Sequence, residues 1–301
     1  MSIPNILAQR YASEDMTIIW SSENKVLLER ELWIAVLQAQ REVGQDIPEE
    51  AIAAYQRTKN DINLESILER EKIVKHDVKA RIEEFCDLAG YQLIHKGMTS
   101  RDLTENIEQL QIRQSVELIQ IQAVAALVHL AKLSEQYSET PITGRTHNVA
   151  AQVTTVGKRF ANAAEEMLLA FLNLEDIIRT YPMRGVKGPV GTQQDLLELL
   201  GDDEKVTEFE ASISEHLGFH STLESVGQVY PRSLDFNIVS SLVQLSSGDG
   251  NTHLVQIEIG QVSAPNLCKI LSDPNKLKLF HFGRFDIAVL LETFGILTTP
   301  V

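Results

Sequence analysis

A histidine that could transfer protons stands in a polar break between two long helical stretches. The break reads Gly144-Arg145-Thr146-His147 and interrupts a helical pattern on both sides. An imidazole with an ordinary pKa of about 6.5 can accept or donate a proton at neutral pH. One histidine alone carries little information, because structural and solvent-exposed histidines are common. The polar groups elsewhere in the chain therefore decide how this one is interpreted.

Several short clusters have the residue types that bind an anionic, nucleotide-sized ligand. Some of them open a predicted helix, whose free N–H groups attract anions. Plainer explanations stay open, because Asp77, Ser100 or Asp102 could simply cap a helix. Tyr11 could likewise pack on the body of the protein. The candidates for substrate binding are Arg10, Tyr11, Lys75, His76, Asp77, Thr99, Ser100 and Gln228, and the catalytic candidate is His147.

Predicted helices must position these groups. Apolar residues recur at spacings of three and four, which indicates helices. The stretch from 103 to 137 has no proline or glycine, so we expect a helix of some 35 residues, as in elongated bundles and oligomer cores. The other expected helices are 22–43, 49–58, 63–70, 77–90, 149–181, 193–200, 202–217 and 222–246, the last one kinked at Pro231.

The pattern changes after Ser246. A turn cluster is followed by alternating branched residues over 252–259, which indicate a strand, and by helical patterns at 264–272 and 285–294. We therefore predict a mainly α protein with a small α/β segment at its C-terminal end. The predicted domains are an N-terminal helical domain at 1–102, a long-helix bundle at 103–246 and the α/β segment at 247–301.

A glycine-rich stretch, 184–192, lies between two predicted helices. It either folds its amides around an oxyanion or merely connects the helices. Its order differs from the phosphate-binding loop of nucleotide triphosphatases, so we do not interpret it as one.

The composition favours a small-molecule partner. The formal net charge is −15 with a pI near 5.0, which disfavours nucleic acid and anionic membranes. Cys86 and Cys268 lack metal-ligand spacing and fit a reducing compartment, so the cytoplasm is the expected location. We expect no signal peptide and no membrane span, because no basic start precedes an apolar segment and no uninterrupted apolar run approaches 18 residues.

Residues 1 to about 246 resemble the adenylosuccinate lyase family of the fumarase/aspartase superfamily. The resemblance is carried, in order, by RYAS.DM..IWS, KHDVKA, GMTSRDLTEN, GRTHNVAAQVTTVGKR, GVKGPVGTQQDLLELLGDD and VGQVYPRSLDF. It implies a long-helix bundle that assembles as a homotetramer. It also implies cleavage of adenylosuccinate to AMP and fumarate, and of the related succinyl-carboxamide ribotide in purine synthesis, without metal or organic cofactor.

The resemblance also implies a role for each candidate residue. His147 would be the general acid/base histidine, and Thr99 and Ser100 would contact the succinyl carboxylates. The remaining candidates match positions of the family's substrate site. The family's base is a serine in a mobile loop, roughly G-S-S-x-M-P-x-K-x-N, and no such string occurs in these 301 residues. We therefore expect ligand binding to outlast turnover, with a non-catalytic helical module as the alternative.

Residues from about 247 to 301 resemble the front part of a ribonuclease D-like 3′–5′ exonuclease. The segment from His281 to Leu290 looks like that family's second acidic motif, which would make Asp286 a metal ligand. The preceding Asp-x-Glu motif is missing, and one carboxylate cannot set up two-metal phosphoryl chemistry. We expect no nuclease activity and no resident metal. The junction at 242–246 fits either parent, which suggests a chimeric chain.

Overall fold

The computed structural model describes residues 6–147, 149–242, 244–246, 252–254, 265–275 and residue 290. The chain divides into two compact units, one comprising Glu14–Tyr230 and the other Ser2–Ser13 with Pro231–Val301. Each unit is mainly helical where it is described, in agreement with the predicted fold class. The domain boundaries predicted at residues 102 and 246 stay predictions.

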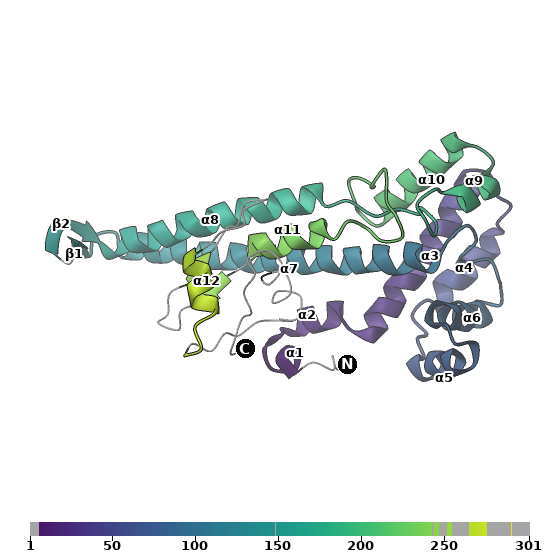
Figure 1. The fold of residues 1–301 in the computed structure, drawn as a ribbon, viewed down its shortest axis with the longest axis horizontal. Coiled ribbons are helices and arrows are strands. Elements are labelled where there is room, and N and C mark those ends of the chain that lie inside the picture. The colour runs from purple at the N-terminus through teal and green to yellow at the C-terminus, as the bar shows by residue number, and fades with distance from the viewer. Residues whose placement is uncertain are drawn as a thin grey trace. The chain divides into compact units, whose positions relative to one another are not determined.

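The first unit is a set of helices with one β-hairpin (Figure 1). Its short and medium helices pack around α3, and its two longest helices form an antiparallel pair. The elements are α2 (Glu14–Ile19), α3 (Ser22–Glu42), α4 (Glu49–Thr58), α5 (Leu64–Val74), α6 (Asp77–Ala89), α7 (Ser100–Gln136), β1 (Pro141–Thr146), β2 (Val149–Thr155), α8 (Val156–Thr180), α9 (Gln194–Leu200) and α10 (Asp203–His216).

The core of this unit lies where α3, α4 and α6 meet. Trp33, Tyr55 and Phe85 are fully buried there, and the Trp33 and Phe85 rings stack with their centroids 6.2 Å apart. Arg30 is buried in the same place and is paired with Glu84 at 2.5 Å. Its guanidinium carbon lies 4.6 Å from the Phe85 ring centroid, so the charge is held by a carboxylate and an aromatic face together. This core fixes α6 against α3.

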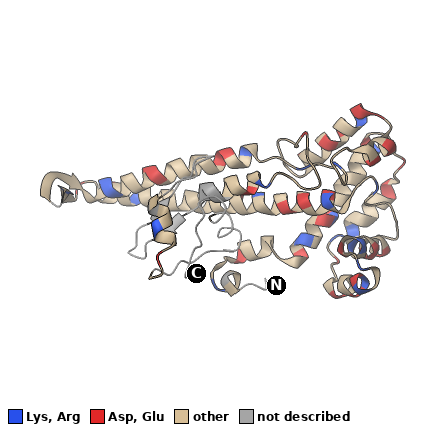
Figure 2. Ribbon diagram, viewed as in Figure 1, with Lys and Arg blue, Asp and Glu red and all other residues tan. Residues whose placement is uncertain are grey.

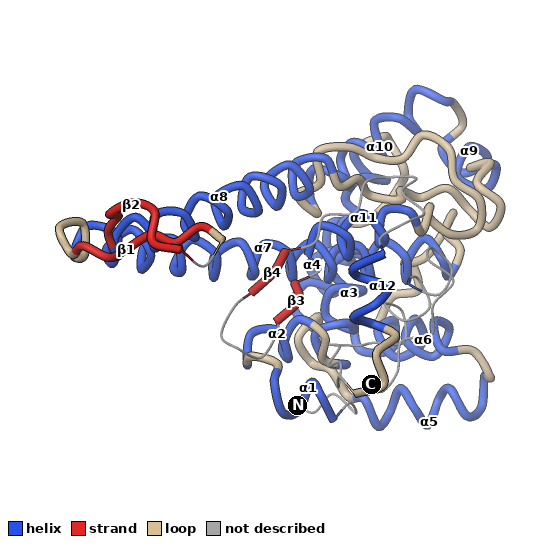
Figure 3. The backbone as a smooth tube through the Cα atoms, turned by 60° about the vertical axis from the view of Figure 1, so that its left-hand side comes forward, coloured by secondary structure: helices blue, strands red, loops and turns tan. Residues whose placement is uncertain are grey.

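The long helix predicted from 103 to 137 is confirmed as α7, which runs beside α8 in both views of the backbone (Figures 1 and 3). The helix predicted to start at Val149 is wrong over its first turns. Residues 149–155 instead pair with 141–146 as an antiparallel hairpin, in which Pro141 faces Thr155 and Thr146 faces Val149. Branched residues on both strands favour this pairing over a helix. Thr155 then caps α8 by accepting a hydrogen bond from the N–H of Lys158.

The second unit has α1 (Ile6–Tyr11), α11 (Ser233–Leu242) and α12 (Pro265–Leu271), and an antiparallel pair of β3 (Gln244–Ser246) and β4 (Thr252–Leu254). The strand expected at 252–259 is confirmed over 252–254, and the helix expected at 264–272 is confirmed as α12. The helix expected over 222–246 is wrong at both ends. The segment before Pro231 is irregular, since proline disfavours helical backbone in the preceding residue, and 244–246 is a strand. Asp286 and most of 285–294 lie outside the described residues.

α7 is the one described helix whose length and composition would allow it to cross a membrane, with a mean hydropathy of 1.5 over 18 residues. One such helix is weak support for a membrane protein. The helix carries no uninterrupted apolar run of 18 residues, because Gln120, Gln122 and His129 fall within its apolar part. Its first turns also contain the buried carboxylates Asp102 and Glu105. The expectation of no membrane span stays a prediction.

Candidate functional site

Three of the predicted site residues meet where α6 and α7 begin. His76 precedes α6, Asp77 is the first residue of α6, and Ser100 is the first residue of α7. The Nε2 atom of His76 lies 3.4 Å from the hydroxyl of Ser100. Two helix N-termini therefore bring an imidazole, a carboxylate and a hydroxyl together, beside backbone N–H groups that favour anions.

The His76 ring is oriented by the helix it caps. Its Nδ1 accepts a hydrogen bond of 3.3 Å from the N–H of Lys79. In the neutral ring the proton is then carried by Nε2, which points at Ser100 as a donor. The plainer explanation of Asp77 as the cap is therefore wrong, because His76 takes that position.

The carboxyl of Asp77 stays ionised to a lower pH than that of an ordinary aspartate. Partial burial acts to raise its pKa, but hydrogen bonds from Arg81 and from the N–H of Val78, with the nearby positive charges, outweigh burial. The pKa of Asp77 is therefore lowered from its ordinary value. A negative charge therefore lies beside the His76 ring, with Oδ1 of Asp77 3.5 Å from Nδ1.

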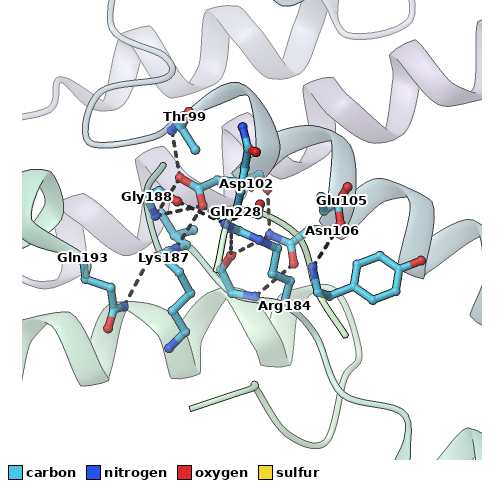
Figure 4. Close-up of polar contacts among 12 residues, drawn as sticks. Thr99, Asp102, Glu105, Asn106, Arg184, Lys187, Gly188, Gln193 and Gln228 are labelled. Carbon is cyan, nitrogen blue, oxygen red and sulfur yellow. Dashed lines mark hydrogen bonds and ion pairs between the residues drawn. The ribbon is translucent and has the colours of Figure 1, made fainter. Parts of the chain in front are cut away.

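Thr99 is held by a buried carboxylate, Asp102, one turn into α7. The N–H of Thr99 donates to Oδ2 of Asp102 at 2.8 Å, which closes the first turn of the helix. Asp102 is fully buried and also accepts from the guanidinium of Arg184 and from the N–H groups of Lys187 and Gly188 (Figure 4). Thr99 is thus the cap of α7, and neither Ser100 nor Asp102 takes that position.

The glycine-rich stretch folds its amides around this carboxylate. The sequence left open whether this stretch binds an oxyanion or merely connects helices. Its amides do bind an oxyanion, which is the side-chain carboxylate of Asp102 and not a ligand. Gly191 adopts a left-handed conformation with φ of 83°, and a Cβ there would collide with the carbonyl of Val226. A glycine is needed for the loop to approach this closely.

Arg184 links the same centre to Gln228. Its guanidinium donates to the backbone carbonyls of Gly227 and Gln228 at 3.3 and 3.2 Å. The side chain of Gln228 is exposed while its backbone is fixed. The Asp102–Arg184 pair therefore connects Gln228 with Thr99, although 129 positions separate them along the chain.

A polar stripe on α7 was missed by the sequence analysis. Its residues are spaced as i, i+3, i+4 and i+7, lie on one face and are fully buried: Asp102, Glu105, Asn106 and Gln109. The side-chain amide of Asn106 makes two hydrogen bonds with the backbone of Gly185. The side-chain oxygen Oε1 of Gln109 accepts a hydrogen bond from the backbone N–H of Arg184. Four polar residues at helical spacing were the available signal, since a buried polar face shows the same periodicity as an apolar one.

His95 was also missed. Its Nδ1 accepts a hydrogen bond of 3.0 Å from the indole of Trp33, and burial lowers its pKa to about 4, with a smaller contribution from the charge of His76. The ring is therefore neutral at physiological pH and carries its proton on Nε2. The backbone of His95 has a positive φ. In the sequence, only its position two residues before the GMTS motif could have marked it as part of the site.

His147 does not join this cluster within one chain. It occupies the tip of the β1–β2 hairpin, is exposed, and has positive φ. The 37 residues of α7 lie between Ser100 and the hairpin, and at 1.5 Å per residue they span about 55 Å. In Figure 1 the hairpin and α6 accordingly lie at opposite ends of α7.

In the described part of the chain, the other predicted residues make no hydrogen bond with Ser100: Lys75 directly precedes His76 in the chain, and two lie in the second unit. Lys75 is exposed at the end of α5 in a left-handed conformation. Arg10 and Tyr11 belong to α1 of the second unit, so their part in the site stays a prediction. A hollow of about 650 Å³ beside α10 is lined by none of the predicted residues. Among the described residues, no group of three or more histidine, cysteine, aspartate or glutamate side chains could hold a metal ion.

A buried carboxylate behind the site should make stability depend on pH. Burial raises the pKa of Glu29 to about 7, although the charges of Arg81 and Lys25 oppose the shift. Because its pKa is higher in the folded than in the unfolded chain, Glu29 favours folding fully below about pH 4.5, and this contribution is lost as the pH rises towards 7. The upper limit of the loss is about 3 kcal/mol.

We therefore expect the variant Glu29→Gln to gain stability relative to the unmodified chain as the pH rises from 4.5 to 8. Urea denaturation at several pH values measures this difference. Glu31→Gln is the matched control, since Glu31 is 35% exposed and pairs with Lys59 at the surface. A difference that does not change with pH would contradict the assignment of a raised pKa to Glu29.

The sequence and the fold both match known proteins. A lyase family model matches residues 11–198, and a 3′–5′ exonuclease model matches residues 230–301. The adenylosuccinate lyase of Saccharomyces cerevisiae is 32% identical over 259 residues, covering 84% of this chain and 53% of the yeast protein. That of Schistosoma mansoni is 31% identical over 248 residues, covering 81% of this chain and 52% of the relative. The chain thus spans about half the length of these relatives.

Solved structures agree on the fold. The 3-carboxy-cis,cis-muconate lactonizing enzyme of Pseudomonas putida superposes with a TM-score of 0.64 at 17% identity, over 79% of this chain and 54% of the other. A fumarate lyase of Mesorhizobium sp. BNC1 gives 0.62 at 22% identity, over 76% and 53%. These similarities, at such low identity, establish the fold alone.

Proposed function

Because the chain belongs to the lyase family whose model covers residues 11–198, we propose that it takes part in releasing fumarate from adenylosuccinate by β-elimination. The same chemistry would act on the succinyl-carboxamide ribotide of purine biosynthesis, in the cytoplasm. The observation that carries the proposal is the meeting of His76, Asp77 and Ser100 at two helix N-termini in a chain with adenylosuccinate lyase relatives.

The proposed roles follow from the chemistry of the groups. Thr99 and Ser100 bind the succinyl carboxylates with their hydroxyl groups and the backbone N–H of Ser100, and His76 contributes a ring N–H. His147 protonates the departing nitrogen, since imidazole is the side chain most often used to transfer protons in catalysis. Arg10, Tyr11, Lys75, Asp77 and Gln228 complete the substrate site. The family's serine base is not among these residues, so this chain alone would bind substrate better than it turns it over.

The proposed site is shared between copies of the chain. A general acid must lie about 3 Å from the atom it protonates, whereas about 55 Å of helix separates Ser100 from the hairpin that carries His147. His147 of one copy must then act with His76, Thr99 and Ser100 of another. The proposal therefore requires a homo-oligomer.

The α7–α8 pair offers a surface on which copies could associate. Residues 118–131 contain no charged side chain, and this part of α7 is uncoloured by charge in Figure 2. Large apolar side chains are exposed on the two helices, and we name them the apolar hairpin face: Ile121, Val124, Val128, Leu168, Leu169 and Leu172. Exposed apolar faces of this kind mark interfaces.

We expect the chain to self-associate through the apolar hairpin face, and light scattering measures its mass in solution. Ile121→Lys should shift the mass towards the monomer, because a charge would be buried between the copies. Ile73→Lys is the control, since Ile73 is 80% exposed on α5. A stable monomer of the unmodified chain would contradict the shared site.

Binding of adenylosuccinate, measured by titration calorimetry, tests the proposed ligand. Ser100→Ala should weaken binding about tenfold or more, since a hydrogen bond to a charged group contributes about 1.5–3 kcal/mol. Ser66→Ala removes a hydroxyl from α5 and serves as the control. No binding by the unmodified chain would refute the proposal. Binding without fumarate release, even after the missing C-terminal part of the lyase is supplied, would identify the alternative, a non-catalytic module.

The exonuclease match over residues 230–301 is the observation behind a second candidate function. Of the acidic motifs that this chemistry needs, only Asp286 is recognisable in the sequence. Two-metal phosphoryl transfer uses several carboxylates. We therefore assign no nuclease activity to the chain.

A further inference from the structure

A line of charged side chains runs from the core of the first unit to His76. Glu29 of α3 is fully buried, and its Oε2 lies 2.7 Å from Nε of Arg81 on α6. Another nitrogen of the same guanidinium lies 2.9 Å from Oδ2 of Asp77, one turn earlier. The remaining oxygen of Asp77, Oδ1, lies 3.5 Å from Nδ1 of His76. The two ends of this line differ, since Glu29 is inaccessible whereas His76 and Asp77 are each 51% exposed.

We propose that Arg81, itself fixed by Glu29, is a positioning residue that sets the Asp77 carboxylate against the His76 ring. This proposal rests on the proposed function in one respect only, namely that His76 binds the ligand. The arrangement of the four side chains does not depend on that function.

The first reason is the mobility that Asp77 would otherwise have. A half-exposed aspartate in the first turn of a helix can rotate towards solvent or towards the free N–H groups of that turn. Arg81 stands four residues later on the same face of α6 and is only 11% exposed, so its guanidinium is held in place. By binding Oδ2, it leaves Oδ1 facing the imidazole.

The second reason is that Nδ1 of His76 needs a different hydrogen-bond partner in each protonation state of the ring. When the ring is neutral, Nδ1 accepts the N–H of Lys79. When the ring is protonated, Nδ1 carries a hydrogen and can only donate, and Oδ1 of Asp77 is the acceptor within reach. With Asp77 held by Arg81, the ring can change its protonation state while Nε2 stays directed at Ser100.

The third reason is the cost of burying Glu29. Neither of its carboxylate oxygens makes an aligned hydrogen bond among the described residues, and Arg81 is its ion-pair partner. A buried ion pair is weak support for stability, and well-packed apolar residues commonly do as well. Through its rigid, planar fork, arginine presents separate nitrogens to the two carboxylates, whereas lysine offers a single point charge. The pair therefore fits a positioning role better than a stabilising one.

The test is NMR of the full chain, labelled with ¹³C in the aspartate side chains and ¹⁵N in the histidine rings. In Arg81→Met the pKa of Asp77 should shift upwards, because the hydrogen bond and charge that lower it are gone. The ¹⁵N signals of His76 should also move towards the average of its two tautomers. Arg70→Met is the matched control, since it breaks an ion pair of 2.7 Å between Arg70 on α5 and Asp87 on α6, the helix that carries Asp77 and Arg81.

Arg81→Lys covers the case in which Arg81→Met does not fold. Lysine keeps the charge without the fork, so the shift of Asp77 should be smaller and the His76 signals should still move. Asp77 and His76 signals in both Arg81 variants equal to those of Arg70→Met would overturn the proposal. Calorimetric binding of adenylosuccinate to the unmodified chain separates the two ideas: its absence would refute the proposed function, while the NMR signals still decide the role of Arg81.

Discussion

Replacing Asp102 with asparagine should lower the free energy of unfolding by about 3–5 kcal/mol, because it leaves a buried arginine without its counter-charge. Arg184 is fully buried, as is Asp102, so no solvent can replace the lost carboxylate. The same change also weakens the acceptor used by the N–H groups of Thr99, Lys187 and Gly188. Urea denaturation measures the loss.

Asp176→Asn is the matched control for this prediction. Asp176 pairs with Arg179 at 2.7 Å, a normal ion-pair distance, but both side chains are about 70% exposed. Exposed pairs of this kind contribute about 0–1 kcal/mol. A loss of less than about 1 kcal/mol for Asp102→Asn would show that the centre around Asp102 does not hold the glycine-rich loop to α7.

Replacing His147 with alanine should lower fumarate release about 10²- to 10⁴-fold, the range that a positioned general acid contributes. The effect has to be measured in a chain that also has the base. A suitable protein joins residues 1–246 of this chain to the corresponding C-terminal part of the Saccharomyces cerevisiae relative, and we call it the completed chain. Release of fumarate from adenylosuccinate, followed by absorbance, gives the rate.

The unmodified 301-residue chain should lie at least about 10²-fold below the completed chain, for want of the base. His216→Ala, which changes an exposed histidine on α10, should leave the rate of the completed chain unchanged. Equal rates for the unmodified and completed chains would refute the missing-base argument. Full activity of the completed chain with His147→Ala would refute the acid role of that histidine.

The helices were predictable because local signals define them. The 37 residues of α7 have no proline or glycine, and Gly90 ends α6 as expected, in a left-handed conformation. The hairpin was not predictable from periodicity, since Val149 to Thr155 is short and continues into a true helix. Only pairing with 141–146, a tertiary effect, determines that it is a strand.

The site was predictable where residues close in sequence share a helix end, as His76 and Asp77 do. The contact between His76 and Ser100 joins two helices and depends on how α6 and α7 pack, which no local pattern encodes. The sequence pattern marks Arg184 only as the first residue of the glycine-rich stretch 184–192. Its pairing with Asp102 across 82 positions follows from burial, because a buried charge needs a counter-charge.

The separation of His147 from Ser100 was implicit in the sequence. A 35-residue helix between two candidate residues already places them about 50 Å apart, and this length was predicted. What sequence could not give is which surfaces of two copies would meet.

The shared site is tested most directly by mixing two impaired variants of the completed chain, His147→Ala and Ser100→Ala, unfolding them together, refolding them and assaying them at a substrate concentration too low to saturate Ser100→Ala. If each site takes His147 from one copy and Ser100 from another, a quarter of the sites, about 25%, regain both groups in an equal mixture. We predict fumarate release at about a quarter of the rate of the completed chain, well above either variant alone. A mixture no more active than its components would contradict the shared site.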